Sequence, residues 1–110
     1  AAVEQARREG HPVLVDFTAA WCATCQLNKK TSLEITSVRE KLKETGTVPL
    51  LADFTAKDPA ILEELQRHER AAVPLVLVYS PDLGQAPDIL PEVLTPTMVL
   101  NALDRAARLK

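Results

Sequence analysis

The sequence predicts an α/β domain in which a mixed four-stranded sheet lies between helices, with an extra helix before the first strand. Three observations support this fold class. Apolar segments alternate with segments of helical composition, in the order helix, strand, helix, strand, helix, strand, strand, helix. The early strand–helix–strand unit implies parallel pairing, and the two consecutive strands near the end imply a hairpin. The chain of 110 residues is 46% hydrophobic, enough for one compact core, so we expect residues 1–110 to form one domain.

The first half of the chain contains the parallel part of the expected sheet. Good helix formers precede Gly10, which supplies a stop. Around Asp16, apolar residues occupy both odd-numbered and even-numbered positions, which indicates a strand covered on both faces. Thr31-Ser32 interrupt the next helical pattern, Thr36-Ser37 have the composition of an N-cap, and Pro49 suits a strand start or a sheet edge. The expected elements are helix 1–9, strand 13–18, helix 23–30, a second helix ending at Gly46, and strand 48–54.

The second half contains two helices that open in the same way. Asp58-Pro59 combines an N-cap residue with proline at the first helical position, and Thr95-Pro96 repeats the pattern. Pro91 restricts its segment to a sheet edge. The expected elements are a helix from Pro59 to residues 68–70 with Ile61, Leu62 and Leu65 on its apolar face, strand 73–79, turn 80–84, edge strand 88–92, and a helix to about residue 108 with Leu100, Leu103 and Ala107 at core spacing.

Composition argues against two classes of partner. A net charge of −2, with one Trp, one Tyr and two Phe, provides no electrostatic footprint for nucleic acid. The longest apolar runs, such as Val73–Tyr79, are far shorter than the roughly 20 residues of a membrane-spanning helix, so we expect no membrane insertion by this chain. It opens with Ala1-Ala2-Val3-Glu4 and no signal-peptide pattern. We expect a mature chain or an excised domain rather than a precursor, and a monomer.

Both cysteines lie in Trp21-Cys22-Ala23-Thr24-Cys25, a spacing that suits a zinc site, a small structural disulfide or redox exchange. Structural zinc needs about four ligands, and only His11 and His68 could add to the pair, without ligand spacing. A bridge this short constrains the unfolded chain little. We therefore favour redox exchange through Cys22 and Cys25, with no metal or other cofactor.

The position of the pair suggests a role for each sulfur. Cys22 follows a strand and begins a helix, where unpaired N–H groups and the helix dipole favour a thiolate, so we expect it to be exposed and to attack. Cys25, one turn further, would be shielded and would resolve the mixed disulfide. Asp16, six residues before Cys22, would lie beneath the pair and accept the proton of Cys25, since burial raises the pKa of a carboxyl. The alternative is an aspartate that is only hydrogen-bonded near the sheet end.

Residues 13–25 and Val73-Pro74 resemble the strand, buried aspartate, W-C-x-x-C motif and cis-proline loop of the thioredoxin superfamily, and the element order matches over nearly the whole chain. The resemblance implies a thioredoxin fold in which Pro74 is cis and packs against the disulfide. It also implies that the Val73 backbone pairs with an incoming substrate strand and that Trp21 flanks the groove. A trans proline that only begins a strand is the alternative.

Within that superfamily the chain is most similar to the C-terminal domain of DsbD-type and ScsB-type thiol:disulfide interchange proteins, on residues 16–22, 37–42, 52–59 and 73–75. This similarity implies a periplasmic protein-disulfide reductase that relays electrons from a membrane-embedded transporter domain to a periplasmic acceptor domain of the same protein. A free-standing cytoplasmic thioredoxin-like reductase is one alternative. A module binding a soft ion such as Cu(I) is another, although Met98 is far from the pair.

Two departures from these families bear on the chemistry. Ala23-Thr24 is neither the Gly-Pro of ordinary thioredoxins nor the Pro-His of strong oxidases, and the absence of a histidine beside Cys22 favours a reducing couple. DsbD-type relatives often carry an acidic residue one turn beyond the second cysteine, where this chain has Lys29. A lysine near the pair would favour the thiolate, and the alternative is a solvated side chain. We expect His11 and His68 at the surface.

Overall fold

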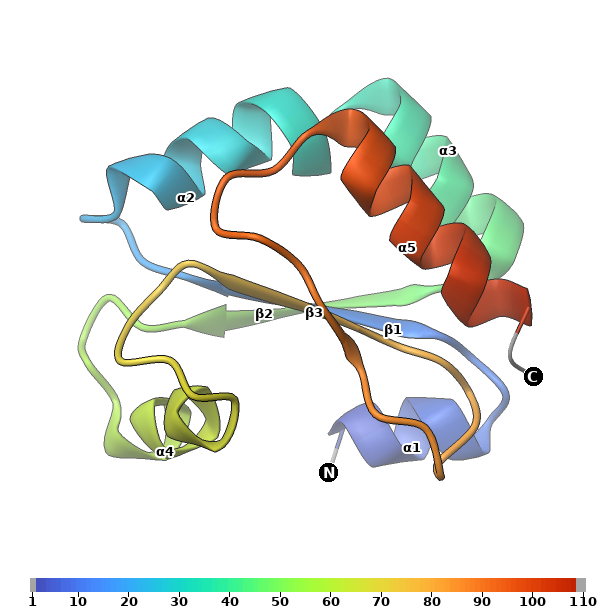
Figure 1. Ribbon diagram of the computed structural model, residues 1–110, viewed down its shortest axis with the longest axis horizontal. Coiled ribbons are helices and arrows are strands. Elements are labelled where there is room, and N and C mark those ends of the chain that lie inside the picture. The colour runs from blue at the N-terminus through green and yellow to red at the C-terminus, as the bar shows by residue number, and fades with distance from the viewer. Residues whose placement is uncertain (1, 109–110) are drawn as a thin grey trace.

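The computed structural model describes residues 2–108, with one central sheet between two layers of helices (Figure 1). The order of elements is the expected one. The elements are α1 (Ala2–Arg8), β1 (Val13–Thr18), α2 (Ala23–Asn28), the π-helix η1 (Lys29–Leu33), α3 (Thr36–Thr45), β2 (Val48–Asp53), α4 (Pro59–Arg67), β3 (Leu75–Tyr79), β4 (Asp88–Ile89) and α5 (Pro96–Arg108).

The sheet has the strand order β2-β1-β3-β4. β1 runs parallel to β2 and antiparallel to β3, and β4 pairs antiparallel with β3, which confirms a mixed sheet that is parallel in its first half. β2 is an edge strand and contains Pro49. The Val48 N–H donates to Pro12 O at 2.9 Å, toward β1, so alternation along the strand turns the nitrogen of Pro49 outward. The missing donor therefore removes no ladder hydrogen bond.

Alternating residues of the two central strands face two buried clusters. α1 and α4 cover one face of the sheet, and α2, α3 and α5 cover the other (Figure 1). Val15 and Phe17 of β1 pack on the face of α1 and α4, in the same cluster as Cys22 and Cys25. Leu14 packs on the opposite face with residues of α3 and α5. The pleat therefore turns Asp16 toward the face covered by α2 and α3.

The helix after the cysteine motif departs from the expectation. We expected a break at Thr31-Ser32, but the chain continues as the π-helix η1. The Thr31 hydroxyl donates to Leu27 O at 3.0 Å, and the buried Ser32 hydroxyl donates to Leu94 O at 3.1 Å. These bonds satisfy both hydroxyls without interrupting the helix, and one extra residue per turn is accommodated. A π-helical turn thus follows directly after the motif helix.

The start of α3 also differs from the expectation. Thr36-Ser37 were expected to cap it, but both residues lie in its first turn, and the N-cap residue is Ile35, which makes no side-chain capping bond. The other helix signals are confirmed. Gly46 ends α3 with φ 68°, and the Asp58 carboxylate accepts from the Ala60 N–H at 2.8 Å at the start of α4.

Several ends of elements are shorter than expected. β2 ends at Asp53, β3 begins only at Leu75, and β4 consists of two residues instead of reaching Glu92, because pairing with β3 stops before Pro91. The buried face of α5 differs from the expected one by about one position. Of the three residues expected in the core, Leu103 is buried, whereas Leu100 and Ala107 are only partly buried. The other buried residues are Val99, Ala102 and Ala106. Part of the expected leading helix, Ala1, lies outside the described residues.

None of the helices within residues 2–108 has the length and apolar character needed to cross a bilayer.

Candidate active site

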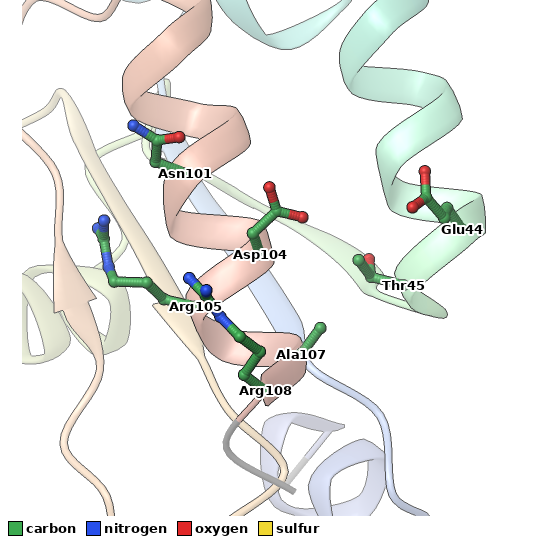
Figure 2. Close-up of a pocket in the computed structure, with 7 residues that line it drawn as sticks. All are labelled: Glu44, Thr45, Asn101, Asp104, Arg105, Ala107 and Arg108. Carbon is green, nitrogen blue, oxygen red and sulfur yellow. The ribbon is translucent and has the colours of Figure 1, made fainter.

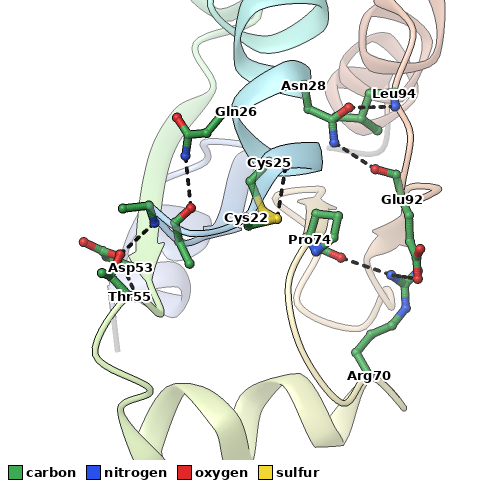
Figure 3. The surroundings of a disulfide bond; sticks show 12 residues. Cys22, Cys25, Gln26, Asn28, Asp53, Thr55, Arg70, Pro74, Glu92 and Leu94 are labelled. Atoms are coloured by element: carbon green, nitrogen blue, oxygen red, sulfur yellow. Dashed lines mark hydrogen bonds and ion pairs between the residues drawn. A yellow bond between two sulfur atoms is a disulfide. The ribbon is translucent and has the colours of Figure 1, made fainter.

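Cys22 and Cys25 form a disulfide at the start of α2, with their Cα atoms 5.2 Å apart (Figure 3). Cys22 is the N-cap residue in an extended conformation, and its Sγ accepts a hydrogen bond from the Cys25 N–H at 3.1 Å. We expected an exposed Cys22 and a shielded Cys25. Cys22 is 8% exposed and Cys25 3%, so the order is as expected, but Cys22 is itself largely covered because it packs in the cluster with Ala19 and Phe54.

The turn from β1 into α2 is held by the loop after β2. The Ala20 N–H donates to the Thr55 hydroxyl at 2.9 Å, and Trp21 Nε1 donates to the Thr55 carbonyl at 3.0 Å. The Asp53 carboxylate in turn accepts from the Thr55 N–H at 2.9 Å. We did not identify Thr55 from the sequence. Its signal was the Asp-x-Thr pattern after a strand, which is typical of a turn closed by the aspartate side chain.

Trp21 lies at the rim of the site and is half exposed. Its ring meets that of Phe54 edge-on, with centroids 6.2 Å apart, and the Lys57 ammonium lies 5.7 Å from its centroid. Together with the bond from its indole N–H, these contacts fix the ring next to Cys22 while half of the residue stays exposed to solvent.

The Val73–Pro74 peptide bond is cis, as the resemblance implied. Figure 3 shows Pro74 beside the disulfide. Val73 is partly buried against the cluster that holds both cysteines. Because the ladder of β3 begins at Leu75, Val73 precedes the paired residues of the sheet.

Asp16 is a partly buried carboxylate whose environment changes its acidity. Burial raises its pKa from 3.8 to about 6, Lys29 opposes this shift and Glu34 adds to it. Burial is the largest cause of the shift, and it acts in the direction that we expected. Asp16 also lines a cavity of about 260 Å³ between β2 and α3, with Val38 and Leu51 among its other walls. Because three of its walls come from Pro49, Leu50 and Leu51, the cavity lies toward the edge strand β2.

Lys29 lies at the junction of α2 and η1 and is partly buried. It lines a second cavity, of about 300 Å³, together with Thr18 and Asp53. The pKa of Asp53 is held below its ordinary value mainly by the Thr55 hydrogen bonds, with a smaller contribution from Lys29. Lys29 thus lowers the pKa of two carboxyl groups. Its partly buried position differs from the alternative that we considered, a side chain surrounded only by water.

Other polar residues lie away from the disulfide. His11 is exposed, as expected, and its Nδ1 lies 3.0 Å from Gly46 O, whereas His68 is partly buried at the end of α4. Within residues 2–108 no group of three or more His, Cys, Asp or Glu side chains is placed to hold a metal ion. A wide, open hollow of about 660 Å³ lies at the C-terminal ends of α3 and α5, remote from the start of α2 (Figures 1 and 2). It is lined by Glu44, Thr45, Asn101, Asp104, Arg105, Ala107 and Arg108.

Comparison with known proteins identifies a matching family and several relatives. Residues 1–81 match the family model described as thioredoxin-like. The chain is 32% identical over 81 residues to the thiol:disulfide interchange protein DsbD 1 of Pseudomonas aeruginosa, covering 74% of this chain and 13% of that protein. It is 33% identical over 81 residues to DsbD of Pseudomonas fluorescens, covering 74% of this chain and 14% of that protein. The chain therefore spans about one seventh of the length of these relatives.

Solved structures show the same fold. The oxidised C-terminal domain of Neisseria meningitidis DsbD superposes with a TM-score of 0.75 at 22% identity, covering 96% of this chain and 90% of that one. A thioredoxin from Thermus thermophilus superposes with a TM-score of 0.71 at 21% identity, covering 94% of this chain and 79% of that one. The expected thioredoxin fold, with its additional N-terminal helix, is confirmed.

Proposed function

The chain belongs to the thioredoxin-like family, and from that premise we propose that it is a thiol-disulfide oxidoreductase, a protein-disulfide reductase that acts through Cys22 and Cys25. The observation that carries the proposal is the hydrogen bond from the Cys25 N–H to Cys22 Sγ at the start of α2. A backbone donor at this position stabilises negative charge on the sulfur, and a thiolate is the form that attacks disulfides. The proposed reaction needs no cofactor besides the cysteine pair.

In the proposed reaction the reduced protein transfers two electrons to a partner disulfide. The Cys22 thiolate attacks one sulfur of the partner, a mixed disulfide forms, and the other partner sulfur leaves as a thiolate. The Cys25 thiolate then attacks Cys22 Sγ, and the first partner sulfur leaves. The partner is now a dithiol, and Cys22 and Cys25 are joined as in the structure.

Cys25 has to lose a proton before the second attack. We propose that Asp16 is the acceptor, because it is turned toward the face of the sheet covered by α2, the helix that contains Cys25. A carboxylate with a pKa of about 6 is also mostly ionised at neutral pH and is a stronger base than an ordinary aspartate.

Trp21, Val73 and Pro74 would bind the partner. An extended segment of the partner can add to the sheet by pairing with the Val73 backbone, which lies just before the paired residues of β3. Proline at position 74 donates no hydrogen bond of its own, and the half-exposed Trp21 ring offers apolar contact at the rim.

The relatives suggest the wider context. The DsbD proteins are named thiol:disulfide interchange proteins, and this chain corresponds to about one seventh of their length. We therefore propose that it acts in the periplasm as one domain of a larger membrane protein, and that it receives electrons from a membrane-embedded domain and passes them to a periplasmic acceptor domain.

Equilibration of the protein with a series of glutathione redox buffers tests the proposal. We expect a reversible two-electron transition near the potential of reducing thioredoxins, about −270 mV, rather than near that of a strong oxidase, about −120 mV. Cys22→Ser should abolish exchange with protein disulfides. Full exchange activity in that variant would refute the proposal.

A further inference from the structure

The segment of residues 90–94, between β4 and α5, is tied to the motif helix by a buried side chain (Figure 3). Asn28 Nδ2 donates to Glu92 O at 2.8 Å, and the Leu94 N–H donates to Asn28 Oδ1 at 3.0 Å. Asn28 is only 2% exposed, so both bonds are shielded from water. The segment is therefore held firmly on the side of α2.

Arg70 connects the same segment to the cis-proline loop. Its Nη1 donates to Pro74 O at 3.2 Å, and its Nη2 donates to Leu90 O over a longer 3.5 Å. The Glu92 carboxylate lies 3.9 Å from Nη1. The arginine side chain is 22% exposed. A guanidinium is a planar fork that can reach two carbonyl groups at once, which the single ammonium of a lysine does less well.

The backbone of Arg70 is itself fixed by the end of α4. The Arg70 N–H donates to Leu65 O and the Glu69 N–H donates to Gln66 O, both at 3.0 Å. Glu69 adopts the left-handed conformation with φ 60°. These are the paired bonds of a Schellman motif, with a glutamate where glycine is usual. The motif turns the chain so that the arginine side chain reaches Pro74.

We propose that Arg70 is a positioning residue of the partner groove, by which we mean the surface formed by Trp21, Val73 and Pro74. Arg70 holds the Pro74 carbonyl so that the Val73 backbone is presented to an extended partner strand. This inference rests on the proposed function. Arg70 acts on the peptide groups of the groove and not on the sulfur atoms. Its loss therefore weakens reactions with partners that pair with Val73, whereas a small disulfide without a peptide strand reacts as before.

The test compares Arg70→Ala with Arg67→Ala, a matched control three residues earlier, at the last residue of α4. The Arg67 side chain is 62% exposed, and within residues 2–108 its ion pairs are those with Glu63 and Glu64 of its own helix. Each reduced protein is reacted with insulin, whose disulfides lie in peptide chains, and with the small aromatic disulfide DTNB. For Arg70→Ala we expect the second-order rate constant for this stoichiometric reduction of insulin to fall about tenfold, because charge-assisted bonds in the groove are lost. The DTNB rate should change less than twofold.

Arg70→Lys provides the second measurement, and it decides the question if the alanine variant does not fold. It keeps the charge but not the fork, so we expect a loss of about threefold toward insulin and none toward DTNB. Equal losses toward both disulfides, or no loss toward insulin, would overturn the role of Arg70. A wild-type protein that reduces neither insulin nor DTNB would instead refute the proposed function.

Discussion

The backbone N–H of Cys25 points at the Sγ atom of Cys22 from 3.1 Å. Cys22 therefore has two roles: its sulfur is part of the disulfide, and the same sulfur caps the N-terminus of α2. The two sulfurs are therefore not equivalent: the fold stabilises charge on Cys22 and covers Cys25 more completely.

This asymmetry predicts which single variant traps a partner. Cys25→Ala should accumulate a mixed disulfide between Cys22 and insulin, because the resolving thiol is missing. Mass spectrometry under non-reducing conditions would detect the adduct. Cys22→Ala is the matched control and should form no adduct. Equal yields from the two variants would mean that the roles of the cysteines are not those proposed.

The raised pKa of Asp16 predicts that the stability of the folded protein depends on pH. Below about pH 4 the carboxyl is protonated in both the folded and the unfolded chain and has no effect. As the pH rises to about 6, the unfolded chain releases this proton first, so wild-type stability falls. Above that pH the folded protein bears the full free-energy cost of burying the charged carboxylate of Asp16. Asp16→Asn should therefore raise the free energy of unfolding at pH 7.5, on the order of 2 kcal/mol, with no gain below about pH 4.

Urea unfolding of wild type and variant at several pH values measures this difference. Asp53→Asn is an opposite-sign control on the neighbouring strand. Its carboxylate is favoured by the Thr55 hydrogen bonds, so the pKa of Asp53 is lowered and the variant should lose stability at neutral pH. A gain for Asp16→Asn that is the same at every pH would show that ionisation of Asp16 is not its cause.

Lys29 and Glu34 predict opposite shifts in the titration of Asp16. Lys29 lowers the pKa of Asp16 and Glu34 raises it. Lys29→Met should therefore move the carboxyl titration to higher pH, and Glu34→Gln should move it to lower pH. The ¹³C chemical shift of the Asp16 carboxyl against pH reports both changes. Shifts in the same direction would show that these charges do not act on Asp16 directly.

The left-handed backbone conformation of Glu69 predicts that a substitution at this position stabilises the protein. A residue other than glycine in the left-handed conformation is strained by its Cβ atom, so Glu69→Gly should increase the free energy of unfolding by about 0.5–1 kcal/mol. Glu63→Gly, in the middle of the preceding helix α4, should decrease the free energy of unfolding by about 1 kcal/mol. Thermal unfolding of the two variants makes the comparison. A loss of stability in both would mean that Glu69 is held by contacts rather than strained.

Local patterns in the sequence predicted much of this fold. Asp58-Pro59 marks the start of α4 because a cap and its helix are neighbours in the chain, and the apolar run around Asp16 marks the central strand because burial on both faces leaves a pattern in six consecutive residues. The cis Val73–Pro74 bond was found only through the resemblance to a family.

The supports of the site were not predicted, because they join distant parts of the chain. Asn28 bonds to Glu92 and Leu94, and Arg70 bonds to Leu90, at separations that no local pattern encodes. The π-helix has the same origin. The sequence predicted a helix break at Ser32, but this residue is helical, and its hydroxyl donates a hydrogen bond to the carbonyl of Leu94.

Pro49, with its nitrogen turned away from the sheet, has a consequence for self-association. An open sheet edge invites pairing with an edge of another molecule, and this is one route to aggregation at high protein concentration. Proline interrupts the row of donors on the outside of β2, and at the opposite edge β4 is only two residues long. A protein proposed to recruit strands beside Pro74 can thus remain dispersed, because neither outer edge of its sheet offers a long template to a neighbour.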